Sequence, residues 1–291
     1  MFPHRLASSL LALVLLIGLV ASAAGASIES SAPAGPSPSV PPSESVAPSE
    51  SALPTPTPVP TTRVVPVLMY HRIGNPPAGA RYPGLYVAVS SFRAQMNWLY
   101  MHGFHPITAA ELGVALRYNR PVPIRSVVIS LDDGRPDSYT AAWPILAKYG
   151  FRATFYVIPG LTRFTVGSRI SWAQAATLAA AGNEIGNHSM THTSLWLVHG
   201  AALARQVVTA GKVIETRLAS LGVTYKVTTF CYPYGHWTGD ALLLLRDAGY
   251  NAAFTTQYGR AVIGSTNRLL VPRLRVDRSL SLAGFAYRLP H

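Results

Sequence analysis

Short apolar runs alternate with segments of helical periodicity along most of this 291-residue chain, from about residue 63 to its end. The runs expected to form strands are 64–70, 126–131, 153–158, 183–188, 227–232, 251–256 and 268–276. The segments expected to form helices between them are 91–102, 109–118, 138–149, 172–181, 195–220 and 239–248. Because a strand followed by a helix recurs about six or seven times, the pattern predicts an α/β fold with a mainly parallel sheet. A closed barrel and an open doubly wound sheet both satisfy this pattern.

Several of the expected helices carry start and stop signals. Ser91, Thr108 and Ser171 stand where an N-terminal cap is needed, and a glycine follows most of the helical segments. Both features are typical of helix boundaries. We therefore expect helices that begin at these residues.

The first 62 residues differ in composition from the rest of the chain. Residues 1–26 contain one charged side chain, Arg5, followed by the apolar stretch SLLALVLLIGLV and a tail of small residues. This order is typical of a secretory signal peptide, and an uncleaved N-terminal anchor is the alternative. Residues 27–62 hold 10 of the 24 prolines, with Ser, Thr and Glu between them, which predicts a disordered spacer. We therefore expect export to the outside of the cell or to its envelope, and one folded domain over 63–291.

Charge and cysteine content narrow the classes of partner and of site. The chain has 24 Lys and Arg against 12 Asp and Glu, a formal net charge of +12 at pH 7. The basic residues are spread without a cluster or a nucleic-acid motif, so we expect no nucleic-acid partner and assign the charge to attraction toward anionic cell-envelope polymers. Membrane contact is expected only through an uncleaved N-terminal segment. Since there is one cysteine, an internal disulfide and a multi-cysteine metal site are excluded, and any metal must be bound by His and carboxylate.

Polar side chains follow the apolar runs, at the strand ends where ligands bind in parallel α/β folds. Asp132 and Asp133 directly follow the run 126–131, and their mutual repulsion in a chain poor in acids calls for a metal or a base role. His188 and His192 are four residues apart, which places both imidazoles on one side of a turn, suitable for one metal ion. The sequence therefore predicts a metal centre built from histidine and carboxylate.

These segments, in this order, resemble the motifs of the polysaccharide deacetylase family, also called the NodB-homology family or carbohydrate esterase family 4. SLDDG at 130–134, HSMTHTSL at 188–195 and FCYPYG at 230–235 match its three principal motifs. VPVLMYHRI at 65–73 and VPRLRV at 271–276 are also similar to family segments. The resemblance implies a distorted (β/α) barrel of about seven parallel strands. It also implies a metal-dependent hydrolase that removes acetyl groups, usually N-acetyl groups of amino sugars in a polysaccharide.

The resemblance assigns roles to individual residues by position. Asp133, His188 and His192 would hold one divalent metal ion, and Asp132 would act as the base that activates a water molecule. The backbone N–H of Tyr234 would complete the site that binds the oxyanion. Such a ligand set suits zinc first, and cobalt, nickel or iron are alternatives.

Two positions depart from the family pattern. Cys231 stands where many members have an arginine that orients the base, and Arg273 in VPRLRV is the candidate replacement. We expect Arg273 within hydrogen-bond or short water-bridged reach of Asp132. The C-terminal hydrophobic-x-His motif, which supplies the general acid in many members, is missing, and only His291 is near its place. His71, which follows the first apolar run, is the better placed histidine for a catalytic role in the pocket.

Other functions stay open on the sequence alone. The expected substrate is an acetylated polysaccharide of the peptidoglycan or poly-N-acetylglucosamine type. An acetyl-xylan or other O-acetyl esterase, a non-sugar amidase and a non-catalytic glycan-binding homologue would all use the same fold. A 2-His-1-carboxylate oxygenase uses similar ligands, but the sequence lacks its H-x-D…H order on an all-β scaffold.

Overall fold

The computed structural model describes residues 60–162 and 167–290. The expected leader at 1–26 and the expected spacer up to residue 59 lie outside the described residues. In the described part of the chain, no helix combines the length and the apolar character needed to cross a membrane.

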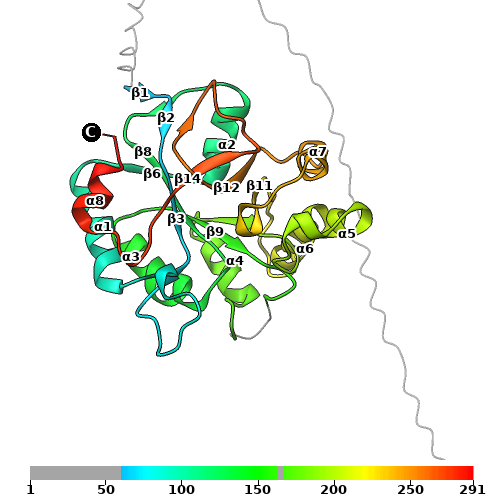
Figure 1. Ribbon diagram of the computed structural model, residues 1–291, viewed down its shortest axis with the longest axis horizontal. Coiled ribbons are helices and arrows are strands. Elements are labelled where there is room, and N and C mark those ends of the chain that lie inside the picture. The colour runs from blue at the N-terminus through cyan, green and yellow to red at the C-terminus, as the bar shows by residue number, and fades with distance from the viewer. Residues whose placement is uncertain (1–59, 163–166, 291) are drawn as a thin grey trace, which may run out of the picture. The chain divides into compact units, whose positions relative to one another are not determined.

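Seven parallel strands close into a barrel (Figure 1). They are β3 (Val67–Tyr70), β8 (Ser126–Leu131), β9 (Thr154–Val157), β10 (Glu184–Asn187), β11 (Thr229–Cys231), β12 (Ala252–Tyr258) and β14 (Val271–Arg275). Their order around the barrel is β3, β14, β12, β11, β10, β9, β8, and the pairing of β3 with β8 closes the ring. Each strand overlaps one of the seven runs expected from the sequence. The α/β prediction is therefore confirmed, and the closed barrel is the correct alternative.

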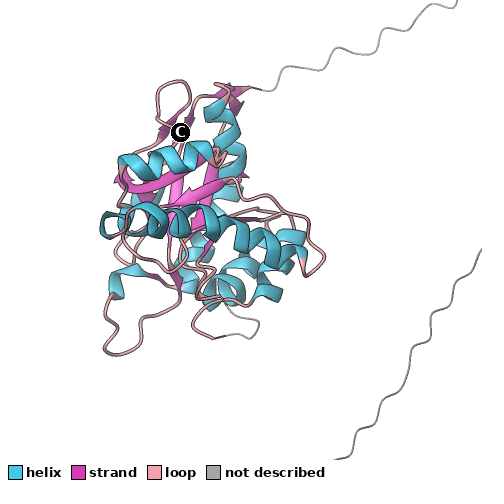
Figure 2. Cartoon of the chain, turned by 90° about the vertical axis from the view of Figure 1, so that its right-hand side faces the viewer, coloured by secondary structure: helices cyan, strands magenta, loops and turns pink. Residues whose placement is uncertain are grey.

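Helices cover the outside of the barrel (Figures 1 and 2). The α-helices are α1 (Val89–Met101), α2 (Ala109–Arg117), α3 (Trp143–Lys148), α4 (Trp172–Ala180), α5 (Gly200–Ala204), α6 (Ala210–Ala219), α7 (Gly239–Asp247) and α8 (Leu282–Tyr287). Thr108 and Ser171 cap the starts of α2 and α4, as the sequence predicts, and each forms a capping box there. The expected cap at Ser91 is wrong, because α1 already begins at Val89 after Ala88.

The single long helix expected over 195–220 is broken in the structure. A 3₁₀ turn, η3 (Leu195–Leu197), is followed by extended backbone, and the α-helix begins only at Gly200. A π-helical turn, η4 (Arg205–Thr209), then joins α5 to α6. Leu195 and Leu203 are both buried in the same core cluster, so the apolar periodicity continues across the break and hides it in the sequence.

Several short elements lack a clear sequence signal. The strand β6 (His105–Ile107) pairs with the first half of β8, and the C-terminal helix α8 packs beside α1 (Figure 1). The remaining short elements are β1 (Thr61–Thr62), β2 (Val64–Val65), β4 (Arg72–Ile73), β5 (Tyr86–Val87), β7 (Val122–Pro123), β13 (Ala261–Val262), η1 (Pro83–Leu85), η2 (Ser138–Ala142) and η5 (Pro233–Gly235). Since β1 pairs with β7, the folded part begins slightly before the expected domain start at residue 63. Two-residue strands are too short for a periodicity of two to be visible.

Alternate residues of the barrel strands face opposite sides of the sheet. Leu68 and Ile129 belong to the large core cluster that includes the surrounding helices. Val67 and Val128 belong to a second cluster, which also contains residues of α2. The barrel is therefore filled by apolar side chains, and polar groups are confined to particular layers of it.

One polar layer closes the amino end of the barrel. Thr154 Oγ1 accepts a hydrogen bond from the backbone N–H of Ala109 at 2.9 Å, and Glu184 Oε2 accepts one from Ala110 at 2.8 Å. The hydroxyls of Thr154 and Thr229 also donate to the carboxyl of Glu184. Burial raises the pKa of Glu184, and these hydrogen bonds only partly oppose that effect. The start of α2 is thus fixed to the strand ends that lie opposite the predicted site.

Candidate active site

The carboxyl ends of the barrel strands open into a pocket of about 680 Å³. The side chains predicted from the sequence that line this pocket are His71, Asp132, Asp133, His188, His192 and Tyr234. Arg273, within β14, is buried directly beneath Asp132. The structure therefore brings every described residue of the predicted site together, where parallel barrels place their ligands.

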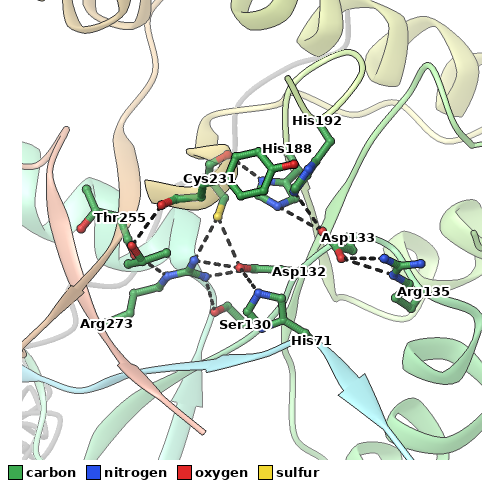
Figure 3. Close-up of polar contacts among 12 residues, drawn as sticks. His71, Ser130, Asp132, Asp133, Arg135, His188, His192, Cys231, Thr255 and Arg273 are labelled. Atoms are coloured by element: carbon green, nitrogen blue, oxygen red, sulfur yellow. Dashed lines mark hydrogen bonds and ion pairs between the residues drawn. The ribbon is translucent and has the colours of Figure 1, made fainter. Parts of the chain in front are cut away.

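Asp133, His188 and His192 point toward one another (Figure 3). Oδ1 of Asp133 lies 3.5 Å from Nε2 of His188 and 3.3 Å from Nε2 of His192. One possible ligand atom from each residue lies within 4.8 Å of the other two. Burial raises the pKa of Asp133, but hydrogen bonds with the two imidazoles outweigh burial and hold this pKa well below its ordinary range. Three converging donors of these types could hold one divalent cation.

Two neighbouring groups hold these side chains in orientation. Nδ1 of His188 lies 2.7 Å from the carbonyl oxygen of Cys231, which leaves Nε2 directed at Asp133. The guanidinium of Arg135 donates two hydrogen bonds, at 3.2 and 3.1 Å, to Oδ2 of Asp133. Oδ1 of Asp133 therefore remains directed toward the histidines, an arrangement that partners of metal ligands commonly enforce.

Left-handed backbone conformations gather around the pocket. Among the described residues, six non-glycine residues have a positive φ, and four of these are Asp133 at 73°, Ser189 at 64°, His192 at 62° and Tyr234 at 61°. Such conformations cost on the order of 1–3 kcal/mol each and persist only where the surroundings enforce them. One enforcing contact is the hydrogen bond from the backbone N–H of His192 to Oγ of Ser189, at 3.0 Å. The fold thus imposes backbone strain where side chains are aimed into the pocket.

Arg273 forms a paired contact with Asp132 inside the barrel (Figure 3). Its Nη1 and Nη2 donate to Oδ1 and Oδ2 of Asp132 at 2.9 and 2.8 Å, as expected from the sequence. The same guanidinium donates to the carbonyl oxygen of Thr255 at 2.8 Å and to Oγ of Ser130 at 3.1 Å. Burial alone would raise the pKa of Asp132, but the charge and hydrogen bonds of Arg273 outweigh burial and lower it to about 2. Asp132 is therefore an oriented, ionised carboxylate.

Cys231 leaves room for this arginine. Its Sγ lies 3.1 Å from Nη2 of Arg273 and 3.6 Å from Oδ2 of Asp132. A side chain larger than cysteine at this position would occupy the space that the guanidinium takes. The small residue in the third motif and the arginine on β14 are thus complementary.

His71 borders the same carboxylate from the pocket side. Its Nε2 lies 3.8 Å from Oδ2 of Asp132. Burial lowers the pKa of His71 and outweighs the opposing effect of Asp132 and Asp133, so the imidazole is neutral near pH 7. A neutral imidazole beside a carboxylate can accept or pass on a proton.

Some pocket residues carry no signal in the sequence. Arg81 and Tyr82 line the pocket, but they come from a loop without a recognisable motif. Arg275 also lines it and belongs to the segment VPRLRV, in which only Arg273 was assigned a role from the sequence. Arg135 also lines it, and its position directly after the segment SLDDG is the one feature that could have pointed to it. His291, the other candidate acid, lies outside the described residues.

A sequence model of the polysaccharide deacetylase family matches residues 119–253. This span contains Asp132, Asp133, His188 and His192. Residues 119–253 thus form a domain of the polysaccharide deacetylase family. The resemblance of the sequence motifs is thereby confirmed, and the chain is a hydrolase of the polysaccharide deacetylase type.

Named relatives agree with this family. The chain is similar to YxkH of Bacillus subtilis, named as a polysaccharide deacetylase, with 26% identity over 76% of this chain and 74% of that protein. It is similar to the poly-β-1,6-N-acetyl-D-glucosamine N-deacetylase of Escherichia coli K12, with 23% identity over 76% of this chain and 38% of that protein. The enzyme of the same name from Staphylococcus aureus MRSA252 is 27% identical over 66% of this chain and 68% of its own length.

Solved structures of the family share the barrel. The deacetylase PplD of Streptococcus pyogenes superposes with a TM-score of 0.72 over 78% of this chain and 99% of that one, at 23% sequence identity. IcaB of Ammonifex degensii superposes with a TM-score of 0.64 over 78% of this chain and 97% of that one, at 25% identity. The distorted barrel of NodB type that the sequence predicts is therefore confirmed.

Proposed function

We propose that this polysaccharide deacetylase is a metal-dependent hydrolase that removes N-acetyl groups from an extracellular amino-sugar polysaccharide, of the poly-N-acetylglucosamine or peptidoglycan type. The observation that carries the proposal is that a set of metal-binding side chains and an oriented carboxylate lie side by side in one pocket. Asp133, His188 and His192 converge on one point, and Asp132 stands beside them as a carboxylate oriented by Arg273. The names of the relatives from Escherichia coli and Staphylococcus aureus support an N-acetylated glucosamine polymer as the substrate.

The donor set fits a divalent cation. Two imidazoles and one carboxylate are ligand types that zinc accepts, and three protein ligands leave a coordination position open. When bound, such an ion would acidify a water molecule and polarise the acetyl carbonyl. A second possible set, Asp132 with His188 and Cys231, also lies within 4.8 Å, but Arg273 already occupies both oxygens of Asp132. We assign the ion to the first set, with zinc as first choice and cobalt, nickel or iron as alternatives.

Asp132 is proposed as the base that takes the proton of the attacking water. The fork of Arg273 keeps its carboxylate ionised and fixed in the plane of the two hydrogen bonds. Proton transfer to a base that is positioned in this way contributes about 10²–10⁴ in rate. Arg273 therefore acts through Asp132, as a positioning residue.

Two further groups face the reacting amide. The backbone N–H of Tyr234 is proposed to donate a hydrogen bond to the acetyl oxygen. Removal of one such donor typically lowers kcat by about 10²–10³-fold. The left-handed conformation of Tyr234 fixes the direction of that part of the backbone. His71 is neutral and its Nε2 lies 3.8 Å from Oδ2 of Asp132, so it is proposed to receive the proton that Asp132 takes from the water and to pass it to the departing amino group.

Export of the protein is part of the same proposal. Its support is the composition of residues 1–26 and 27–62, which is typical of a signal peptide or anchor and a spacer. An exported deacetylase would meet its polysaccharide outside the cytoplasm, in the extracellular space or the cell envelope. The basic charge of the chain would favour association with anionic polymers there.

Release of acetate tests the proposal. Purified protein is incubated with β-1,6 and β-1,4 N-acetylglucosamine oligomers, peptidoglycan fragments and acetyl-xylan, and the loss of acetyl groups is followed by mass spectrometry. We expect loss from at least one of the N-acetylated glycans and none from the xylan. Loss from acetyl-xylan alone would replace the proposal with an O-acetyl esterase, and loss from no substrate would favour a non-catalytic glycan-binding protein.

A further inference from the structure

An exposed tryptophan stands beside the active-site pocket. Trp196, in the 3₁₀ turn η3, is 57% exposed. Its indole Nε1 donates a hydrogen bond to the carbonyl oxygen of Trp237 at 3.0 Å. One face of the indole is stacked on the imidazole of His236, with ring centroids 3.5 Å apart and an interplanar angle of 8°. Because the imidazole covers one face, the opposite face is the one that a ligand could reach, and the stack and the hydrogen bond hold it in a fixed direction.

The partner ring is itself fixed. Nδ1 of His236 shares a hydrogen bond with Oγ of Ser194, at 2.8 Å. The loop that carries Ser194 and Trp196 is thus braced against the loop that carries His236 and Trp237 by two hydrogen bonds and one ring stack. Because these contacts already order the rings, little conformational entropy remains to be lost when a ligand lands on them.

A row of neighbouring aromatic rings connects Trp196 to His192, one of the proposed metal ligands. The ring of Tyr234 lies 4.7 Å from that of His192 in an edge-on arrangement, and 5.7 Å from that of His236. Tyr234 is 58% exposed and lines the pocket. Three short ring-to-ring steps therefore lead from His192, in the pocket, to Trp196, outside it. We call Tyr234, His236 and Trp196 the aromatic platform.

We propose that the aromatic platform binds sugar residues of the polysaccharide next to the one whose acetyl group is removed. This inference rests on the proposed function, since it takes the substrate to be a glycan chain. The indole N–H is already bonded within the protein, so the free face of Trp196 offers only a flat apolar surface. A pyranose ring presents a matching apolar face of C–H groups, with its hydroxyls directed outward to water.

The position of the platform favours a glycan over other occupants. A polymer whose acetylated residue sits beside His192 has to leave the pocket, and the platform begins at the wall of the pocket. A protein partner or a membrane would favour a broad apolar patch, but the exposed apolar side chains at η3 are Trp196 and Leu197 alone. A single row of aromatic rings matches the width of one polysaccharide chain.

Dependence of the kinetics on substrate length tests the inference. Trp196→Ala is compared with the unaltered protein on β-1,6-linked N-acetylglucosamine oligomers of two and six sugars, by acetate release. We expect KM for the hexasaccharide to rise about 5- to 10-fold with kcat unchanged, the size of one lost aromatic contact, and both constants for the disaccharide to stay the same. Trp196→Phe should retain part of the effect, since it keeps a flat ring. Tyr118→Ala is the matched control, because Tyr118 is also 57% exposed but lies at the end of α2.

Direct binding separates this inference from the proposed function. The hexasaccharide is titrated calorimetrically into Asp132→Asn protein with and without Trp196→Ala, and the second change should weaken binding by the same factor. Binding that depends on Trp196 without any hydrolysis by the unaltered protein would overturn the proposed function and keep the inference. Equal KM and equal affinity with and without Trp196, or an equal loss at both oligomer lengths, would overturn the inference. Binding to phosphatidylglycerol vesicles that requires Trp196, with unchanged oligomer kinetics, would assign the platform to a membrane instead.

Discussion

The guanidinium of Arg273 and the carboxylate of Asp132 form two parallel hydrogen bonds, at 2.9 and 2.8 Å, with side chains that are 0% and 2% exposed. The two residues are 141 positions apart in the sequence. Arg273 lies in β14 and Asp132 directly follows β8, and both of these strands flank β3 in the barrel. Closure of the barrel is therefore what brings them together. An ion pair exposed to water contributes little to folding stability. Inside the barrel, loss of either partner would leave the other charge buried without a counter-charge, which is strongly destabilising.

Replacement of Arg273 by lysine should distinguish the effect of its positive charge from the effect of its planar guanidinium. Arg273→Lys keeps a positive charge but loses the planar fork that also bonds Thr255 and Ser130. We expect turnover to fall about 10- to 100-fold, the usual cost of removing a partner that orients a site. The measurement is kcat on one N-acetylated oligomer together with thermal unfolding of the same preparation.

Two further variants accompany Arg273→Lys: Arg273→Ala removes the whole side chain, and a substitution of an exposed arginine serves as the control. Arg273→Ala leaves a buried carboxylate unpaired, so it should also destabilise the fold by about 3–5 kcal/mol. Arg246→Lys, in an exposed ion pair with Asp247, should change neither quantity. If Arg273→Lys turned over like the unaltered enzyme, the fork would have no part in positioning Asp132.

Asp132→Asn tests the division of roles between the two adjacent aspartates. Asparagine keeps the shape of the side chain but cannot take up a proton, so turnover should fall about 10²–10⁴-fold. The bound metal should stay, because Asp132 lies outside the proposed ligand set. The metal content is measured on the same sample by elemental mass spectrometry. Loss of the metal in this variant would mean that the two aspartates have been assigned the wrong way round.

The sequence predicts the barrel well because its signals are local. Most of the barrel strands lie in apolar runs, and Thr108 and Ser171 carry capping boxes that are complete within four residues. The site residues in the motifs are likewise found where a strand ends. Contacts that depend on closure of the barrel are harder to predict, and Arg273 was identified only because Cys231 departs from the family pattern. Arg135 has only its position directly after SLDDG as a signal. The stacking of Trp196 on His236 has no signal in the sequence, because it depends on how two loops pack against each other.

The buried carboxyl of Glu184 should make stability depend on pH. Burial raises its pKa above the ordinary value of 4.5, so the native state binds a proton that the unfolded chain has released. This stabilisation is fully present below pH 4.5 and is lost as the pH rises through the raised pKa. We expect Glu184→Gln to flatten this decline, by about 1.4 kcal/mol for each pKa unit of the shift.

Urea unfolding over a series of pH values measures this effect. The control is Asp247→Asn, which removes an exposed carboxylate and should leave the pH dependence unchanged. A decline with the same slope in Glu184→Gln as in the unaltered protein would show that Glu184 does not cause it.

Removal of the expected leader and spacer should leave a folded, active domain. A chain that begins at Pro60 keeps the hydrogen bond from the N–H of Ile124 to the carbonyl of Pro60 and the pairing of β1 with β7. We expect its kcat/KM on short oligomers to lie within about twofold of that of the mature protein. A chain that begins at Val64 loses these contacts and should be less stable by on the order of 1 kcal/mol. A Pro60 chain that no longer unfolds cooperatively would show that residues before Pro60 pack on the domain.

The metal content of the purified protein, measured together with acetate release, tests the central claim most directly. We expect one divalent ion per chain, loss of both ion and activity after chelation, and recovery of activity when zinc is added back. His188→Ala should bind the ion weakly and release no acetate, whereas His102→Ala, with an exposed imidazole outside the pocket, should match the unaltered protein. Full metal content in His188→Ala, or undiminished acetate release from chelated protein, would contradict the account.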